Sequence, residues 1–84
     1  LKMQNLTEFI NYLKARIVLS EIISTHVKIM RRGRLKLGLC PFHSEKTPSF
    51  HIRDEQGTYH CFGCGAHGDV FSFLQAVEGV SFME

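Results

Sequence analysis

The chain has 84 residues, so it holds one domain at most, and apolar burial alone stabilises a domain of this size only marginally. Its three cysteines cannot all pair with one another, which makes a disulfide framework a poor candidate for the missing stability, whereas a bound metal can supply it. The net charge is only +2, no stretch is long and apolar enough to cross a membrane, and no signal-peptide pattern opens the chain. Together with unpaired thiols, these features predict a cytoplasmic protein with no membrane partner.

Two helices are predicted in the first third of the chain. Apolar residues recur at helical spacing from Leu6 to Ile17, which predicts an amphipathic helix over residues 6–16. A second, short helix is expected over residues 19–25, with Ile22 and Ile23 packing inward. Core packing explains these apolar residues, so no functional role is assigned to them.

A β-hairpin is predicted next, because the apolar period changes to two from residue 27 and Gly33 marks a turn. Alternate residues, among them Leu35 and Leu37, give this hairpin one apolar face. If that register holds, the opposite face is basic. The expected basic face comprises Lys28, Arg32, Arg34 and Lys36.

The hairpin holds five of the ten basic residues within nine positions, and no acidic residue interrupts them. Such a local patch on a nearly neutral domain suggests an anionic partner such as nucleic acid. A solvated hairpin that only keeps the chain soluble is the alternative, and charge alone does not separate the two.

Two more strands and a third helix complete the expected fold. Alternation around Phe50 and Ile52 predicts a third strand, residues 54–57 a turn, and residues 58–61 a fourth strand. After a glycine-rich connector at residues 65–68, Asp69 is a good N-cap for a helix that Gly79 can close. The predicted fold is therefore α+β, with an antiparallel sheet of about four strands flanked by short helices.

The last four residues, 81–84, have the pattern of a capping box, which predicts the start of another helix. We therefore expect the chain, residues 1–84, to be a single domain at the N-terminus of a longer protein.

Four residues form two pairs with the spacing of metal ligands. A C-x2-H pair is followed, after seventeen residues, by a C-x2-C pair, and each pair lies beside turn-forming proline or glycine. Two such turns predict one tetrahedral zinc site of the Cys3His type, which is structural because no coordination position stays open for water. The predicted ligands are Cys40, His43, Cys61 and Cys64. The alternative is that the cysteines are small buried hydrophobic residues.

The fourth ligand is the least certain of the set, because three other histidines lie near in sequence. His43 is favoured since each turn then contributes two ligands. His67 lies in the glycine-rich connector, and His60 is adjacent to Cys61 in a strand, so its side chain should point the opposite way. His51 is also near in sequence.

No catalytic apparatus is recognisable. The eight acidic residues are scattered without the close pairing of a two-metal centre, and the glycine-rich segment lacks the Lys-Ser/Thr of a phosphate-binding loop. We therefore expect that this chain alone is not an enzyme.

Two long segments resemble a known family. Residues 38–50 read GLCPFHSEKTPSF and residues 59–69 read YHCFGCGAHGD, and together they closely resemble the N-terminal zinc-binding domain of bacterial replicative DNA primases. The resemblance implies a zinc ribbon with one Zn²⁺ that binds single-stranded DNA template and helps select the start site for RNA primer synthesis in DNA replication.

It also implies two domains that lie outside this chain. One is a Toprim-type polymerase domain that uses Mg²⁺ to join ribonucleotides, and the other is a C-terminal domain that binds the replicative helicase. The chain would then be one domain of an enzyme, a DNA-directed RNA polymerase.

By motif position, the resemblance carries the metal ligands to Cys40, His43, Cys61 and Cys64. Basic and aromatic residues near these motifs are the candidates for phosphate contact and base stacking, whereas Phe50 and Phe73 are expected in the core. At position 36 this chain has lysine where relatives often have an aromatic residue. The template-contact candidates are Arg32, Arg34, Lys36, Lys46, Arg53, Phe42, Tyr59 and Phe62.

Two other functions remain open. The ribbon could be an interaction module that docks on the polymerase domain of its own or a neighbouring primase chain, in which case the basic hairpin faces an acidic protein surface. It could also be the zinc domain of a phage-type primase-helicase. Crosslinks from Arg34 or Lys36 to template, rather than to protein, would favour template recognition.

Overall fold

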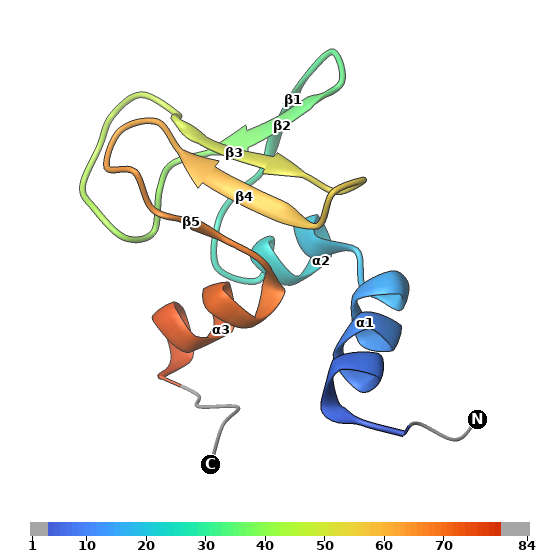
Figure 1. Ribbon diagram of the computed structural model, residues 1–84. Helices are drawn as coiled ribbons and strands as arrows, with labels where there is room; N and C mark the ends of the chain where they lie inside the picture. Colours follow the sequence, from blue (N-terminus) through green and yellow to red (C-terminus); the bar gives the residue numbers. More distant parts are fainter. Residues whose placement is uncertain (1–3, 80–84) are drawn as a thin grey trace.

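Five short strands form one antiparallel sheet in the computed structural model, which describes residues 4–79 (Figure 1). Each strand pairs with its neighbour in sequence, so the sheet is a simple meander. The strands are β1 (Met30–Arg32), β2 (Leu35–Gly38), β3 (Phe50–Arg53), β4 (Thr58–Cys61) and β5 (His67–Gly68). The predicted α+β class is confirmed, with one strand more than expected.

The fifth strand replaces part of the predicted connector. His67 pairs with His60, and Gly68 pairs with Tyr59, so β4 supplies the partners for β5. A strand of two residues has no alternation of its own, which is why the sequence pattern did not indicate it.

Three helices accompany the sheet: α1 (Leu6–Arg16), α2 (Leu19–Ile23) and α3 (Val70–Glu78). Asp69 caps α3 as predicted, since its carboxylate accepts hydrogen bonds from the N–H groups of Phe71 and Ser72, and Gly79 ends the helix with a φ of 70°. Asn5 caps α1 by accepting the N–H of Glu8. No helix within residues 4–79 has the length and apolar character needed to span a membrane. The helix expected over residues 81–84 lies outside the described residues.

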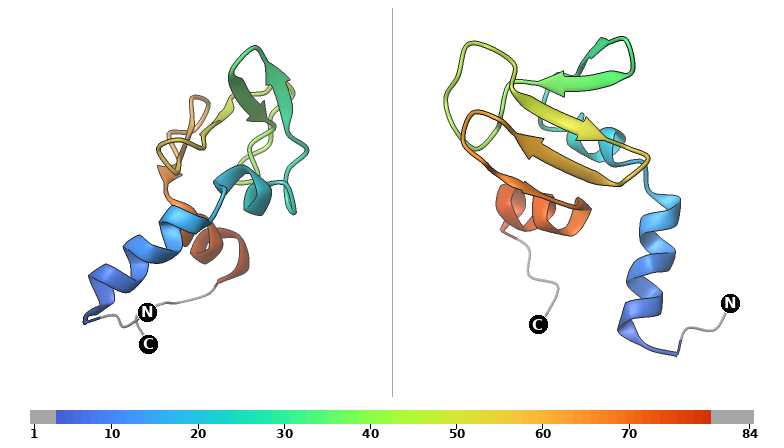
Figure 2. Two further views of the ribbon diagram at one scale, coloured as in Figure 1. Left: turned by 90° about the vertical axis from the view of Figure 1, so that its right-hand side faces the viewer. Right: turned by 45° about the horizontal axis from the view of Figure 1, so that its top comes forward.

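The helices α2 and α3 lie against one face of the sheet, and α1 extends away from it (Figure 2). Paired residues in neighbouring strands point to the same side, so the register defines an inner face toward α2 and α3. Phe50 and Phe73 are fully buried between the sheet and α3, as predicted. The inner face of the central strands carries Phe50, Ile52, Tyr59 and Cys61.

The opposite side, which we call the outer face, has one row of side chains that crosses all five strands. Successive pairs link this row from β1 to β5. It contains Met30, Leu37, His51, His60 and His67.

The predicted register of the hairpin is wrong. Arg32 pairs with Leu35 and therefore lies on the outer face, whereas Lys36 pairs with Arg31 and Ile52 and lies on the inner face. The period of two was correct within each strand, but Arg32 pairs with Leu35 across a two-residue turn, so even-numbered positions of β1 share a face with odd-numbered positions of β2. The expected basic face of Lys28, Arg32, Arg34 and Lys36 is therefore divided between the two sides.

The inward position of Lys36 serves the fold. Its Nζ lies 2.5 Å from Asp54 Oδ2, while Ser20 at the start of α2 donates its N–H to Asp54 Oδ1 (2.7 Å) and its hydroxyl to Oδ2 (2.6 Å). The residue before α2, Val18, has no capping side chain, so Asp54 takes that role from the β3–β4 turn. Burial would raise the pKa of the Asp54 carboxyl, but the hydrogen bonds from Lys36 and Ser20 hold it below its ordinary value.

Candidate metal centre

The four predicted metal ligands meet at one end of the sheet. Cys40 and His43 lie in the loop between β2 and β3, Cys61 ends β4, and Cys64 lies in the turn before β5. The pairing of Phe50 with Cys61 brings the two loops side by side. One ligand atom from each of the four residues lies within 4.8 Å of all the others.

The distances between ligand atoms fit a tetrahedral zinc ion. Zinc–sulfur bonds of about 2.3 Å place two sulfurs about 3.8 Å apart in a tetrahedron. Cys40 Sγ and Cys64 Sγ are separated by 3.8 Å, and Cys61 Sγ lies 3.9 Å from His43 Nδ1. The residues present therefore fit zinc, whose chemistry in a four-ligand site of this kind is structural.

The other histidines lie elsewhere. His51, His60 and His67 all belong to the outer-face row, and His67 Nδ1 lies 3.0 Å from the carbonyl oxygen of Gly65. His60 points away from the metal centre because it precedes Cys61 in the same strand, as expected from alternation.

Both ligand turns direct backbone N–H groups at sulfur. The N–H of Phe42 lies 3.3 Å from Cys40 Sγ, and the N–H of Gly63 lies 3.3 Å from Cys61 Sγ. These bonds stabilise the thiolate forms of the two cysteines, because a hydrogen bond to the charged form of a group favours that form. Burial raises the pKa of the Cys40 thiol to about 12, so metal binding displaces a proton from this sulfur.

One carboxylate in this region was missed by the sequence reasoning. Glu45 was counted only among scattered acids, yet it lies within hydrogen-bond distance of His43, Cys40 and Ser49. The hydrogen bond from Ser49 holds the pKa of the Glu45 carboxyl below its ordinary value, although burial opposes this. The sequence did contain one indication of this contact, since Glu45 lies only two residues after His43.

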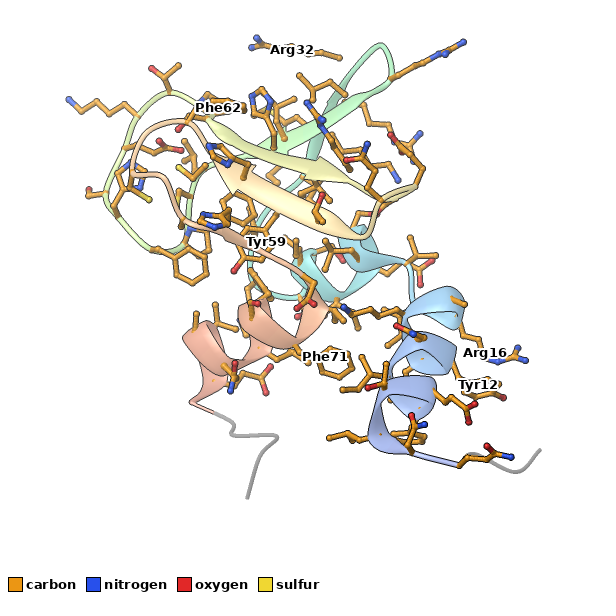
Figure 3. All side chains as sticks on the ribbon, viewed as in Figure 1. Tyr12, Arg16, Arg32, Tyr59, Phe62 and Phe71 are labelled. Atoms are coloured by element: carbon orange, nitrogen blue, oxygen red, sulfur yellow. The ribbon has the colours of Figure 1, made fainter. Side chains whose placement is uncertain are left out.

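Three of the template-contact candidates lie on the outer face or directly beside it. Arg32 and Arg53 are exposed there, and Phe62, which follows β4, is 64% exposed. Figure 3 shows Phe62 and Arg32 on the opposite side of the sheet from Tyr59. The Phe62 ring contacts the rings of His51 and His60 at centroid distances of 4.8 and 4.5 Å.

A hollow of about 350 Å³ opens on this face. Its lining includes the side chains of His51, Arg53, Thr58, His60, Phe62 and His67. Aromatic rings and one guanidinium therefore share a single solvent-facing depression.

Three other candidates lie differently from what was expected. Tyr59 is only 4% exposed and stacks on Phe50, so the expectation that its ring is available to a base is wrong, because it shares the inner-face row with Ile52. Phe42 is half-buried against Phe50, Tyr59 and Phe73. Lys36 is bound to Asp54.

The remaining two candidates, Arg34 and Lys46, are exposed in the hairpin turn and in the loop after His43.

A small antiparallel sheet with two ligand-bearing loops that converge on one Cys3His cluster is a zinc ribbon. The chain belongs to the CHC2 zinc finger family, whose model matches residues 5–84.

Similar proteins include a DNA primase of Lactococcus lactis subsp. lactis (strain IL1403), 47% identical over 78 residues, and one of Thermotoga maritima, 49% identical over 77 residues. These alignments cover 93% and 92% of this chain but only 12% and 14% of the two relatives.

A solved structure shares the fold. It is the crystal structure of the Aquifex aeolicus primase, comprising zinc-binding and RNA polymerase domains. The match has a TM-score of 0.80 and 32% sequence identity, and it covers 88% of this chain and 18% of that one. The family that the two sequence motifs resembled is therefore confirmed.

Proposed function

We propose that this chain is the template-recognition domain of a DNA primase, that it holds one structural zinc ion, and that its outer face binds single-stranded DNA. The observation that carries this proposal is the exposed ring of Phe62, which lines the same hollow of the outer face as Arg53. The relatives support the setting, since their names identify them as DNA primases.

A hollow that contains both an exposed aromatic ring and a guanidinium suits an unpaired nucleic-acid strand. Each base that stacks on an aromatic side chain contributes about 1 to 3 kcal/mol, and it does so with little dependence on sequence. The Phe62 ring contacts His51 edge-on and His60 at a tilt, yet Phe62 remains 64% exposed, so part of its ring surface is open to a base. Start-site selection would then come from polar groups of the hollow that contact base edges.

Phosphate contacts are assigned to the exposed arginines. Arg32 and Arg53 flank the outer face, and Arg34 lies at the tip of the hairpin. Three such contacts predict a slope of about −2 in a plot of log affinity against log salt, because each phosphate of a single strand contributes about −0.7. Lys36 is left out of this set because Asp54 holds its charge on the inner face.

The domain would act beside other parts of a primase. We propose that it presents template to a polymerase domain of the same or a neighbouring chain, which would supply the Mg²⁺ chemistry, and that a replicative helicase binds a further domain. This role places the protein in the cytoplasm, where the thiols remain reduced.

The test is a fluorescence-anisotropy titration of a labelled single-stranded oligodeoxynucleotide with the zinc-loaded chain. Phe62→Ala should weaken binding about 5- to 150-fold, which corresponds to the loss of one stacked base. Tyr12→Ala is the matched control, because Tyr12 lies on α1 with Arg16 over its ring and belongs to neither face of the sheet (Figure 3).

Arg53→Ala should lower the salt slope by about 0.7, and Arg16→Ala should leave it unchanged. Binding that does not depend on salt, or equal losses for Phe62→Ala and Tyr12→Ala, would contradict template recognition by the outer face. Crosslinks from Arg34 that reach only protein in a full-length primase would favour the interaction module instead.

A further inference from the structure

The loop that follows His43 turns back over the metal centre and places Glu45 beside it. The Glu45 side chain is only 10% exposed. Its carboxylate accepts three hydrogen bonds from two residues, Cys40 and Ser49, and lies 3.1 Å from the His43 ring nitrogen Nε2. A mostly buried carboxylate with this many partners helps to order the loop and is not a solvated surface charge.

Each oxygen of this carboxylate has a separate set of partners. Oε2 accepts the backbone N–H of Cys40 at 2.8 Å and that of Ser49 at 3.2 Å. Oε1 accepts the Ser49 hydroxyl and lies 3.1 Å from His43 Nε2. Glu45 therefore connects one metal ligand through its backbone and a second ligand through its ring.

The orientation of the His43 ring follows from these contacts. A neutral imidazole carries one N–H, and a bare nitrogen lone pair on Nε2 would be repelled by the carboxylate oxygen 3.1 Å away, so the contact favours the tautomer with its proton on Nε2. Nδ1 then has a free lone pair, and it is the nitrogen that faces the sulfurs, 3.9 Å from Cys61 Sγ. A histidine ligand whose other nitrogen donates to a carboxylate is fixed in both tautomer and orientation.

We propose that Glu45 is a positioning residue of the metal centre, which makes His43 an Nδ1 ligand and joins the backbone of the first ligand turn to the imidazole. Glutamine cannot replace it, because its amide nitrogen is a donor and would face either the two backbone N–H groups or the His43–Ser49 pair. If the amide of glutamine instead favoured the His43 tautomer with its proton on Nδ1, the lone pair that binds metal would be lost.

Gly63 gives independent support from the second ligand turn. A Cβ added at Gly63 would lie 2.8 Å from His43 Nε2, 2.9 Å from Ser49 Oγ and 3.0 Å from Glu45 Oε1. The φ of Gly63 is not in the left-handed region, so its backbone conformation does not require glycine. The space beside it is instead occupied by the side chains of His43, Glu45 and Ser49.

The first experiment measures zinc affinity by competition with a chromophoric chelator. Glu45→Gln should weaken zinc binding about 10- to 100-fold, as expected for loss of a carboxylate partner of a histidine ligand. Glu55→Gln is the matched control, because Glu55 is exposed in the β3–β4 turn, and it should leave the affinity unchanged. Gly63→Ala should also weaken binding. Equal affinities for Glu45→Gln and Glu55→Gln would overturn the proposal.

The second experiment needs no substitution and therefore does not depend on whether a variant folds. Long-range ¹H–¹⁵N correlation spectra of the zinc-loaded chain distinguish the protonated from the metal-bound nitrogen of His43. We expect zinc on Nδ1 and the proton on Nε2. Zinc on Nε2 would overturn the proposal, whatever the template-binding experiment shows.

Discussion

The sheet with its ligand loops and the helix α1 are held in place by different means. In the sheet region Phe50, Cys61 and Phe73 are completely buried, whereas α1 has no buried residue, and its Leu6 and Phe9 are 55% and 46% exposed. The difference shows that the ribbon builds its own core around the ligand loops and that α1 adds little to it. Pattern alone does not reveal this, because α1 has the clear amphipathic period of a core helix.

The attachment of α1 depends on a few polar contacts. Lys14 Nζ lies 2.6 Å from Asp69 Oδ2 and 6.0 Å from the ring centroid of Phe71. An apolar hollow of about 520 Å³ separates the two helices and is lined by side chains of both. Lys14 and Asp69 are 40% and 29% exposed, and ion pairs of that exposure contribute about 1 kcal/mol or less.

Removal of zinc should have the largest effect and should affect mainly the ribbon. A structural zinc ion contributes about 10 to 16 kcal/mol of apparent binding energy, which is comparable to the whole stability of a small domain. We expect chelation to abolish the cooperative thermal transition in circular dichroism, and added zinc to restore it. An unchanged melting temperature after chelation would show that the sheet does not need the ion.

Substitution of one phenylalanine in each region should separate them further. Phe73→Ala removes a fully buried ring that contacts Phe50 and Tyr59, and it should lower the free energy of unfolding by about 3 to 5 kcal/mol. Phe9→Ala on α1 should cost less than about 1 kcal/mol. Urea denaturation with zinc in excess measures both. Similar costs for the two variants would contradict the contrast between the regions.

Effects smaller than that of Phe73→Ala are predicted at the junction of the two regions. Asp69→Ala removes the α3 cap together with the ion pair and should cost about 1 to 2 kcal/mol, whereas Lys14→Ala removes only the ion pair and should cost less than about 1 kcal/mol. In both variants the backbone amides of α1 should exchange hydrogen faster, while those of β3 and β4 remain protected. A larger cost for Lys14→Ala than for Asp69→Ala would show that the ion pair matters more than the cap.

The metal ligands could be predicted because their signal is local. Each pair spans four residues, and a tight turn is enough to direct both side chains at one ion. The caps of α3 were predictable for the same reason, since Asp69 and Gly79 act within one turn of the helix. Glu45 acts over a similarly short range, but its partners include a ligand ring whose orientation depends on the folded loop.

The faces of the sheet could not be predicted from alternation. Lys36 faces inward because Asp54 and Ser20, distant in sequence, form its site, and Tyr59 is buried because α3 covers its side of the sheet. Alternation gives two sets of side chains but does not say which set the helices cover. Tertiary contacts decide that point, so the candidates for template contact had to be reassigned after the fold was known.

Phe62 directly follows Cys61 in the chain, so the position of the exposed ring on the outer face depends on a ligand of the metal centre. The N–H of Phe62 donates to the carbonyl of Ser49 at 2.9 Å, and the N–H of the next residue, Gly63, donates to Cys61 Sγ. The hydrogen bonds of the ligand turn therefore fix the backbone of Phe62 and Gly63 before any single-stranded DNA binds. Such preorganisation reduces the conformational entropy lost when a base stacks on the ring. A structural metal that does not contact DNA would thereby strengthen DNA binding, because it restricts the conformations of the Phe62 ring in the free protein.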